Sequence, residues 1–450
     1  MVRIDFSDGG GRIKPLHGVG QPPFYGLDFS KFHYLTEAGI PYSRLHDVGG
    51  TLGGGLFVDI PNLFRDFDAD PADPAAYDFA FTDRLITALV EAGVEPFFRL
   101  GVSIENDRRV KVYRIDPPGD DLKWARICEG VIRHYTEGWA DGFAYTIRYW
   151  EIWNEPEGHP DPLINEMWTG TAQRFYRLYG TAATYLKARF PHLKIGGYGS
   201  CGFYGALGQP PEAFGMSRER MEYFHAFFDG FLAYIKENQC PLDFFSWHSY
   251  ASIRDTETFA VYARRHLDEA GYTDTETVCD EWNCAPATRG TARHAALCAG
   301  MLAAMQQMPL DSAMFYDARF GVSMYGGMFN PLTGQPFPAY YAFYAFNILY
   351  RLGQEVAVIT DTADPDGAGE GSLYLLAARG PAPAGSAQGT DGLRGGVLVI
   401  NPTDRACPLS LTAEGRLLSC RVVDGTRTWE EIALPDRIGP DSFLLIEYAL

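Results

Sequence analysis

The chain alternates short apolar runs with amphipathic segments from about residue 15 to residue 353. In the amphipathic segments apolar residues recur every three or four positions, as at Phe81, Leu85 and Leu89, which is the spacing of one helix face. Eight of the short runs have the composition of buried strands. The expected strands are Leu16–Val19, Tyr42–His46, Pro96–Leu100, Tyr149–Trp153, Leu193–Gly197, Phe244–His248, Thr277–Asp280 and Ala313–Tyr316.

Eight strands that alternate with helices predict an α/β fold, a closed (β/α)8 TIM barrel over residues 16–353. After residue 353 short strands are separated by turns rich in Gly, Pro and Asp, which predicts an accessory β-sandwich domain over residues 354–450. Within it, Gly380–Gly396 is expected to form a long hairpin loop. Residues 1–15 contain an alternating stretch, Val2–Phe6, that we expect to join the β-sandwich. The other accessory strands are expected at Val356–Thr360, Ser372–Ala378, Gly396–Asn401, Leu409–Thr412, Leu417–Val423 and Phe443–Tyr448.

Composition narrows the class of ligand. Hydrophobic residues make up 46% of the 450 positions and charged residues 21%, which is typical of a globular protein and excludes a disordered chain. The formal net charge of −19 repels phosphate backbones and anionic lipids, so we expect no nucleic acid and no membrane as partner. A neutral ligand suits this charge better. The oligomeric state is left open, and a homo-oligomer is allowed.

Several familiar motifs are missing from the sequence. No apolar run is long enough for a signal peptide or a membrane helix, and the eight cysteines lack zinc-type spacing, so we expect reduced thiols and a cytoplasmic location. Gly49–Gly55 has neither the dinucleotide nor the Walker spacing of glycines, and the ten histidines show no HExxH pattern. We therefore expect no metal, nucleotide or flavin cofactor.

The strongest chemical signal is a strand that runs into an Asn-Glu-Pro turn, Tyr149–Glu157. In a barrel the carboxyl ends of strands face the active site, and Pro156 would fix the turn that holds Glu155. A second strand, three strands later, ends at Glu281 in Thr277–Asn283. Two carboxyl groups at the barrel mouth, one protonated and one ionised, are what glycoside hydrolysis needs.

These runs and several others resemble glycoside hydrolase family 39 of the retaining barrel clan A, which includes β-xylosidases and α-L-iduronidases. The resemblance covers most of residues 16–353 and implies a TIM barrel with an accessory β-domain. It is carried by YSRLHD at 42–47, WEIWNEPEGH at 150–159, DFFSWHSY at 243–250, CDEWN at 279–283 and GQPFPAYYAFYAFNILYRLG at 334–353.

The resemblance assigns roles to two carboxyl groups. It implies that Glu155 is the general acid/base and Glu281 the nucleophile, and that Asn154 binds the sugar hydroxyl next to the anomeric carbon. The carboxyl groups should then lie about 5–5.5 Å apart, as in retaining enzymes. We expect Glu281 to be ionised at neutral pH and Glu155 to keep its proton.

The remaining site residues are also implied by the resemblance. Arg44 should lie beneath the carboxylates and favour ionised Glu281, and His46 should bind a sugar hydroxyl. Of His248 and Tyr250, one should lie near the acid/base and the other should orient the nucleophile, and the sequence does not say which. Trp282 and Tyr316 complete the expected substrate site.

The chain departs from the family at two places. CDEWN stands where xylosidases of the family more often have Thr-Glu-Trp, and in a regular strand Asp280 would point away from the face that carries Glu281. The segment 315–320, FYDARF, replaces a Trp-rich stretch of xylosidases, which leaves the sugar open. Other carboxyl groups near strand ends are secondary candidates: Glu105, Glu151 and Glu157.

The leading hypothesis is a retaining, exo-acting glycosidase that removes a terminal pentose, as a β-xylosidase does. The same chemistry on an arabinofuranoside, galactoside or uronide is the first alternative, and a uronide would need a cation such as Arg254 or Arg319. A non-catalytic carbohydrate-binding barrel is an alternative from another class. The presence of both Glu155 and Glu281 argues against it, because binding alone requires no acid and nucleophile.

Overall fold

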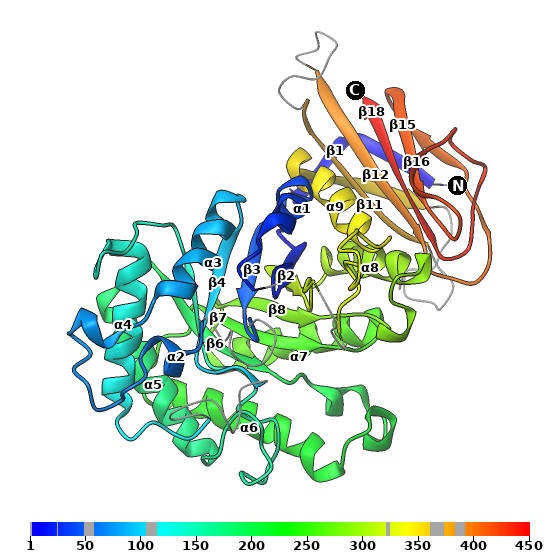
Figure 1. The fold of residues 1–450 in the computed structure, drawn as a ribbon. Coiled ribbons are helices and arrows are strands. Elements are labelled where there is room, and N and C mark those ends of the chain that lie inside the picture. Colours follow the sequence, from blue (N-terminus) through cyan, green and yellow to red (C-terminus); the bar gives the residue numbers. More distant parts are fainter. Residues whose placement is uncertain are drawn as a thin grey trace.

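Eight parallel strands close into a barrel in sequence order, from β2 to β9 (Figure 1). The computed structural model describes residues 2–24, 26–48, 58–104, 115–320, 325–360, 373–382 and 392–450. The predicted TIM barrel is confirmed, and each expected strand overlaps an observed one. The barrel strands are β2 (Gly18–Gly20), β3 (Tyr42–Leu45), β4 (Glu95–Leu100), β5 (Tyr149–Ile152), β6 (Lys194–Ser200), β7 (Phe244–Ser249), β8 (Glu276–Trp282) and β9 (Ser312–Phe315).

Helices surround the barrel, and α4 to α8 each begin at a side chain that accepts a hydrogen bond from the backbone of the first turn. Thr171, for example, accepts a hydrogen bond from the backbone of Arg174 and starts α5, and Ser252 does the same for α7. The helix after the first strand has only five residues. The helices are α1 (His33–Glu37), α2 (Ile60–Leu63), α3 (Ala80–Glu91), α4 (Asp121–Glu137), α5 (Ala172–Arg189), α6 (Arg218–Glu237), α7 (Ile253–Ala270), α8 (Ala292–Met305) and α9 (Tyr340–Leu352).

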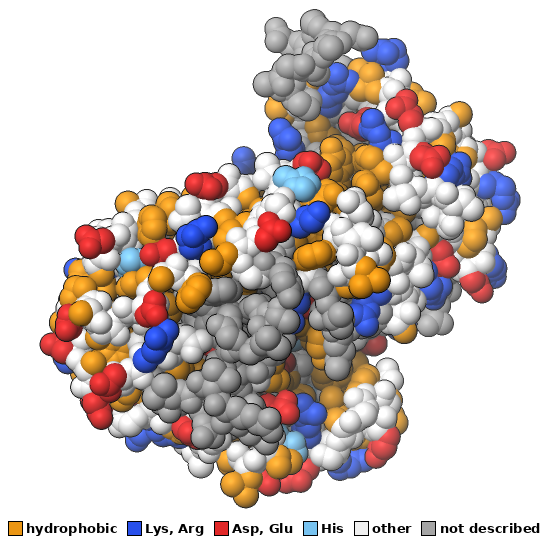
Figure 2. All heavy atoms as spheres, viewed as in Figure 1, with side chains coloured by type: hydrophobic (Ala, Val, Ile, Leu, Met, Phe, Trp, Pro, Cys, Tyr) orange, Lys and Arg blue, Asp and Glu red, His pale blue; other side chains and the backbone are white. Residues whose placement is uncertain are grey.

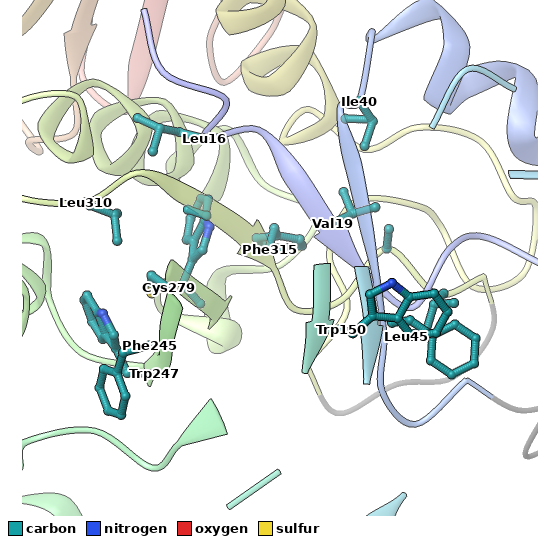
Figure 3. Packing of buried hydrophobic residues seen from close by; sticks show 14 of the residues in the cluster. Leu16, Val19, Ile40, Leu45, Trp150, Phe245, Trp247, Cys279, Leu310 and Phe315 are labelled. Atoms are coloured by element: carbon teal, nitrogen blue, oxygen red, sulfur yellow. The ribbon is translucent and has the colours of Figure 1, made fainter. Parts of the chain in front are cut away.

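Two apolar layers follow from the alternation of side chains along the barrel strands. One set, which includes Leu45, Trp150, Phe245 and Phe315, belongs to the large core shared with the surrounding helices (Figure 3). The other set packs as a separate cluster inside the barrel. This inner cluster consists of Tyr42, Phe97, Tyr149, Phe244, Val278 and Met314.

The accessory domain is β-rich, as predicted, and its strands form one curled, mixed sheet with a separate two-stranded ribbon. Strand β1 near the amino terminus pairs antiparallel with β10 and parallel with β14, and β18 near the carboxyl terminus belongs to the same sheet (Figure 1). The sheet order is β14-β1-β10-β11-β12-β18-β15-β16, and β13 pairs with β17. The strands are β1 (Val2–Arg12), β10 (Gln354–Thr360), β11 (Tyr374–Pro381), β12 (Leu393–Asn401), β13 (Cys407–Pro408), β14 (Leu411–Ala413), β15 (Arg416–Val423), β16 (Thr428–Glu431), β17 (Arg437–Ile438) and β18 (Ser442–Ala449).

Strands β11 and β12 extend into the segment that we expected to be a loop. Their antiparallel pairing continues from Tyr374–Ile400 to Pro381–Leu393. The rest of the expected loop, 383–391, lies outside the described residues. The hairpin is therefore longer, and its connection shorter, than the composition of Gly380–Gly396 indicated.

One face of the accessory sheet packs directly on α9. Leu376 and Leu398 belong to the same buried core as Phe346 of that helix. A glycine makes the close approach possible, because a Cβ atom at Gly380 would lie 1.9 Å from the backbone oxygen of Leu352. The barrel and the accessory domain thus share one continuous core.

The surface shows no single sign of charge on the face drawn in Figure 2, where acidic and basic side chains are interspersed over both domains. Among the described residues, no helix is long and apolar enough to cross a membrane. The eight cysteines are free, and seven of them are buried.

We predict that Gly380→Ala destabilises the protein by about 2 kcal/mol or more, because the new methyl group meets backbone and no side-chain rotation relieves the clash. Urea denaturation followed by circular dichroism measures the effect. Gly425→Ala is the matched control, since a Cβ atom there meets nothing within 4 Å. Equal stability of the two variants would contradict the close docking of α9 on the sheet.

Candidate active site

A polar layer lies above the inner apolar cluster, at the carboxyl ends of the strands. Tyr42 and Tyr149 belong to the apolar cluster, and two residues further along their strands come Arg44 and Glu151. In the same way Phe244 is followed by Ser246 and His248 on β7. Because successive side chains of a strand alternate between its faces, these polar groups point into the barrel and meet at its mouth.

The Arg44 guanidinium is the centre of this polar layer. It is 1% exposed and contacts acidic or amide oxygens of β5, of the turn that follows β5, and of β8. Its partners are Glu151 Oε2 at 2.7 Å from Nε, Asp280 Oδ2 at 2.7 Å from Nε, Glu281 Oε1 at 2.7 Å from Nη1 and Asn154 Oδ1 at 2.7 Å from Nη2. A buried charge is tolerated only with such partners, so Arg44 fixes the positions of all four groups.

Glu281 on β8 accepts hydrogen bonds at both oxygens. Arg44 Nη1 donates to Oε1 over 2.7 Å, and the Tyr250 hydroxyl donates to Oε2 over 2.6 Å. Its side chain is only 7% exposed. Two donors aimed at two acceptors hold the carboxyl group in one orientation.

Asp280 also points into the barrel, contrary to the expectation for a regular strand. The pairing of β8 with β7 skips one residue, from Trp247–Cys279 to His248–Glu281. This β-bulge adds a residue to β8, so Asp280 and Glu281 both face the mouth.

Glu155 lies immediately after β5 on a sharply turned backbone. Both Trp153 and Glu155 have left-handed backbone angles, with φ of +75° and +44°. Such angles are costly for non-glycine residues and concentrate at functional sites. The turn is held by a backbone hydrogen bond from Glu155 to Gly199 (3.0 Å), and the Glu155 side chain is 24% exposed.

His248 links the two carboxyl groups at the mouth. Its Nδ1 forms a hydrogen bond of 2.8 Å with Glu155 Oε1 and lies 3.6 Å from Glu281 Oε2. Tyr250 therefore lies at the proposed nucleophile and His248 at the proposed acid/base, which the sequence left undecided.

His248 and Glu155 shift each other's pKa in opposite directions. Burial opposes the charge of the imidazole, but Glu281 and Glu155 outweigh it and raise the pKa of His248. Burial likewise opposes ionisation of Glu155, but the hydrogen bond and charge of His248 lower the pKa of Glu155. Both directions favour a proton on His248 over one on Glu155, which differs from the expectation that Glu155 keeps its own proton.

The two mouth carboxyl groups are close together. One oxygen of each, together with a ring nitrogen of His248, lies within 4.8 Å of the others. Among the described residues this is one of two groups with the composition of a metal site. The other, buried behind the mouth, consists of Cys284, His294 and Cys298, with the two sulfur atoms 3.5 Å apart.

A second polar cluster borders the mouth at the ends of β2, β3 and β9. The Tyr316 hydroxyl receives a hydrogen bond from Gln21 (2.5 Å) and donates one to Asp47 (2.8 Å). Its ring lies 6.5 Å from that of Tyr250, so the predicted residue Tyr316 does belong to the site region. His46 adjoins the same cluster, with Nε2 3.2 Å from Asp47.

Gln21 and Asp47 were not identified from the sequence. Each directly follows a barrel strand or lies two residues beyond it, and each has a left-handed backbone angle, with φ of +48° and +51°. Their position at the carboxyl ends of strands was the available signal.

Trp282 does not lie in the site, contrary to the prediction. Its side chain is fully buried and stacks on Phe343 of α9, with ring centroids 5.9 Å apart. Because Glu281 points inward, the next residue of the strand points outward to the helices.

The secondary candidates have different places. Glu151 is buried beneath Arg44, and Glu157 is buried near the mouth, where burial raises its pKa to about 7. Glu105 and the Gly49–Gly55 segment lie outside the described residues.

Comparison with known proteins identifies the family. The family model described as "Glycosyl hydrolases family 39" matches residues 31–280, more than half of the chain. The chain belongs to glycosyl hydrolase family 39. The match ends one residue before Glu281, and it includes the Asn-Glu-Pro turn and the Arg44 strand.

Individual relatives agree with this assignment. A β-xylosidase of Caldicellulosiruptor saccharolyticus is 29% identical over 169 residues, which are 36% of this chain and 31% of that protein, so the chain spans about a third of the curated relative it matches. A glucosidase structure from Croceicoccus marinus is 22% identical, with a TM-score of 0.74 over 100% of this chain and 98% of that one. A GH39 β-xylosidase structure from Caulobacter crescentus is 18% identical, with a TM-score of 0.66 over 99% of both chains. The two structures share the fold.

We predict that Tyr250→Phe lowers kcat/KM by about 10- to 100-fold, because a hydrogen bond to a charged group contributes about 1.5–3 kcal/mol. The rate is measured with an aryl glycoside that the enzyme hydrolyses. Tyr149→Phe is the matched control, since its hydroxyl donates to Glu276 at the opposite end of the barrel over 2.8 Å. Equal losses in the two variants would contradict a specific role of the Tyr250 hydroxyl.

Proposed function

We propose that the protein is a retaining, exo-acting glycosidase that removes a terminal sugar by double displacement, and that its preferred sugar is a β-linked pentose. The observation that carries the proposal is the pair Glu155 and Glu281, with an oxygen of each within 4.8 Å of the other. Retaining enzymes place these groups about 5–5.5 Å apart, whereas inverting enzymes leave room for a water molecule between carboxylate and sugar.

The unequal surroundings of the two carboxyl groups support their division of labour. Glu281 is nearly buried and held by Arg44 and Tyr250, which suits a nucleophile that must keep one orientation. Glu155 is more exposed and is bonded to His248, which suits a group that exchanges protons with a leaving group and with water.

In the first step, Glu281 attacks the anomeric carbon while the leaving oxygen takes a proton from Glu155. That proton comes from His248 across the 2.8 Å hydrogen bond. The charge of Glu281 favours protonated His248, and this charge disappears as the glycosyl ester forms. The histidine then binds its proton less tightly, so attack and proton release are coupled.

In the second step, Glu155 takes a proton from water, and the water attacks the anomeric carbon from the side that the leaving group vacated. Glu281 is released as a carboxylate, and the sugar keeps its configuration. Asn154 is held by Arg44 over 2.7 Å, in a position suited to the sugar hydroxyl next to the anomeric carbon.

The charged groups beside Tyr316 carry both signs. Asp47 is a buried carboxyl group that accepts a hydrogen bond from the Tyr316 hydroxyl, and Arg319 binds Gln21, the other partner of that hydroxyl. Arg319 donates to Gln21 over 2.5 Å, and Arg254 is exposed on α7. The preference for a pentose comes from the β-xylosidase of C. saccharolyticus.

A panel of nitrophenyl glycosides tests the function. We expect release of nitrophenol from the β-xyloside above that from arabinofuranosides, galactosides, glucosides and uronides, and release of single sugars from the non-reducing end of xylo-oligosaccharides. Binding of sugars without hydrolysis of any glycoside would favour the non-catalytic barrel and overturn the proposal.

Replacement of each carboxyl group should have a distinct result. We predict that Glu281→Gly abolishes turnover, because no covalent intermediate forms, whereas Glu155→Ala retains activity on aryl glycosides whose leaving groups need little protonation. Azide should rescue Glu155→Ala with a glycosyl azide of retained configuration, and any azide product of Glu281→Gly should be inverted. The products are identified by nuclear magnetic resonance, and the reverse stereochemistry would exchange the two roles.

A further inference from the structure

Three carboxyl groups surround the one guanidinium of Arg44, and two of them compete for the same N–H. Oxygens of Glu151 and Asp280 each lie 2.7 Å from Nε, which carries a single hydrogen. The hydrogen bond is directed at Glu151. If both groups were ionised, two negative charges would adjoin each other in a site that excludes water, since both side chains are fully buried.

The available donors favour Glu151 as the ionised partner. Ser246 donates to its Oε1 over 2.6 Å, and Arg44 Nε donates to its Oε2. Among the described residues, neither oxygen of Asp280 receives such a hydrogen bond. A proton on Asp280 that is donated to Glu151 removes the repulsion and gives Glu151 a third donor.

We propose that Asp280 is a protonated positioning residue, whose O–H donates to Glu151 and thereby leaves Arg44 free to hold the Glu281 carboxylate. Its placement depends on the β-bulge in β8, which brings two successive carboxyl groups into the barrel. The catalytic part of this inference rests on the proposed function. The protonation of Asp280 does not, because it concerns the folded protein alone.

The charged groups around Asp280 come from four strands. They are Arg44 on β3, Glu151 on β5, His248 on β7, with Nε2 3.6 Å from Asp280 Oδ1, and Glu281 on β8. Burial raises the pKa of Asp280 well above its usual range, and Glu151 and Glu281 add to the effect while Arg44 opposes it. Burial also opposes ionisation of Glu151, but Arg44 and the hydrogen bond from Asp280 outweigh it and lower the pKa of Glu151.

Stability as a function of pH tests the protonation without any substrate. A carboxyl group whose pKa is raised in the folded state binds a proton that the unfolded chain releases above about pH 4, so folding becomes less favourable as pH rises. Asp280→Asn carries no titrating proton and replaces the O–H donor with an amide N–H donor. The ratio of the wild-type equilibrium constant for unfolding to that of the variant should therefore rise with pH, by up to about tenfold for each pH unit.

The experiment compares wild type, Asp280→Asn and Glu151→Gln by thermal and urea unfolding from pH 5 to pH 8. We expect the midpoint of Asp280→Asn to rise relative to wild type with increasing pH, and Glu151→Gln to unfold more easily than wild type throughout, since it loses a buried anion beside Arg44. A constant or falling difference for Asp280→Asn would show that Asp280 is ionised. If the midpoint of Glu151→Gln, and not that of Asp280→Asn, rose relative to wild type with increasing pH, the proton would have to be assigned to Glu151. Either result overturns the proposal.

Kinetics then test the positioning role. Asp280→Ala should lower kcat/KM for an aryl glycoside at least about tenfold, the effect of losing one hydrogen bond in the Arg44 network. Asp280→Asn should have most of the wild-type kcat/KM and the same pH profile, because its amide is also a neutral donor. Equal loss in both variants would contradict the role. An inactive wild type with the expected unfolding behaviour would refute the proposed function alone.

Discussion

The arrangement at the barrel mouth depends on the burial of one positive charge. Arg44 stands directly above the inner apolar cluster and is almost inaccessible to solvent, so its charge must be met by protein groups. It meets Glu151, Asp280 and Glu281 at 2.7 Å and also holds Asn154. Removal of such a cation would leave buried anions unpaired, which typically costs about 3–5 kcal/mol. The same contact that preserves the fold therefore orients the nucleophile.

The electrostatic asymmetry of the site follows from this arrangement. Glu281 has a permanent cation and a hydroxyl group as partners, whereas Glu155 has His248, whose charge changes with protonation. A fixed partner suits a group that must remain an anion until it attacks. A titrating partner suits a group that must give up and regain a proton in each cycle. His248 contacts both carboxyl groups, so a change in the charge of one changes the proton affinity of the histidine that contacts the other.

Much of this could be predicted from the sequence, because strand periodicity determines both position and direction. The eight barrel strands were found from their apolar runs, and the carboxyl ends of two of them gave Glu155 and Glu281. The short strands β13, β16 and β17 were missed, since their residues are mostly exposed or half-buried and lack the apolar alternation of a buried strand. The bulge at Asp280 was missed as well, because nothing in CDEWN distinguishes a regular strand from one with an extra residue.

Other errors arose from contacts between residues far apart in the chain or from loop conformation. The resemblance placed Trp282 in the site, next to Glu281, but the outward face of β8 packs on α9. The proton was assigned to Glu155 because two neighbouring carboxyl groups were considered without the histidine that lies between them. Gln21 and Asp47 lie in loops with left-handed backbone angles, and hydrophobic periodicity does not predict the conformation of such loops.

The central claim is that Glu281 forms a covalent bond to the sugar while Arg44 holds it. Inactivation by an activated 2-deoxy-2-fluoro glycoside of the preferred sugar, followed by mass spectrometry of proteolytic peptides, tests this claim most directly. The account predicts one sugar per chain, attached to Glu281, and release of the label when an acceptor is added. A label on Glu155 or on another side chain, or turnover of the reagent to a sugar of inverted configuration with no labelled enzyme, would contradict it.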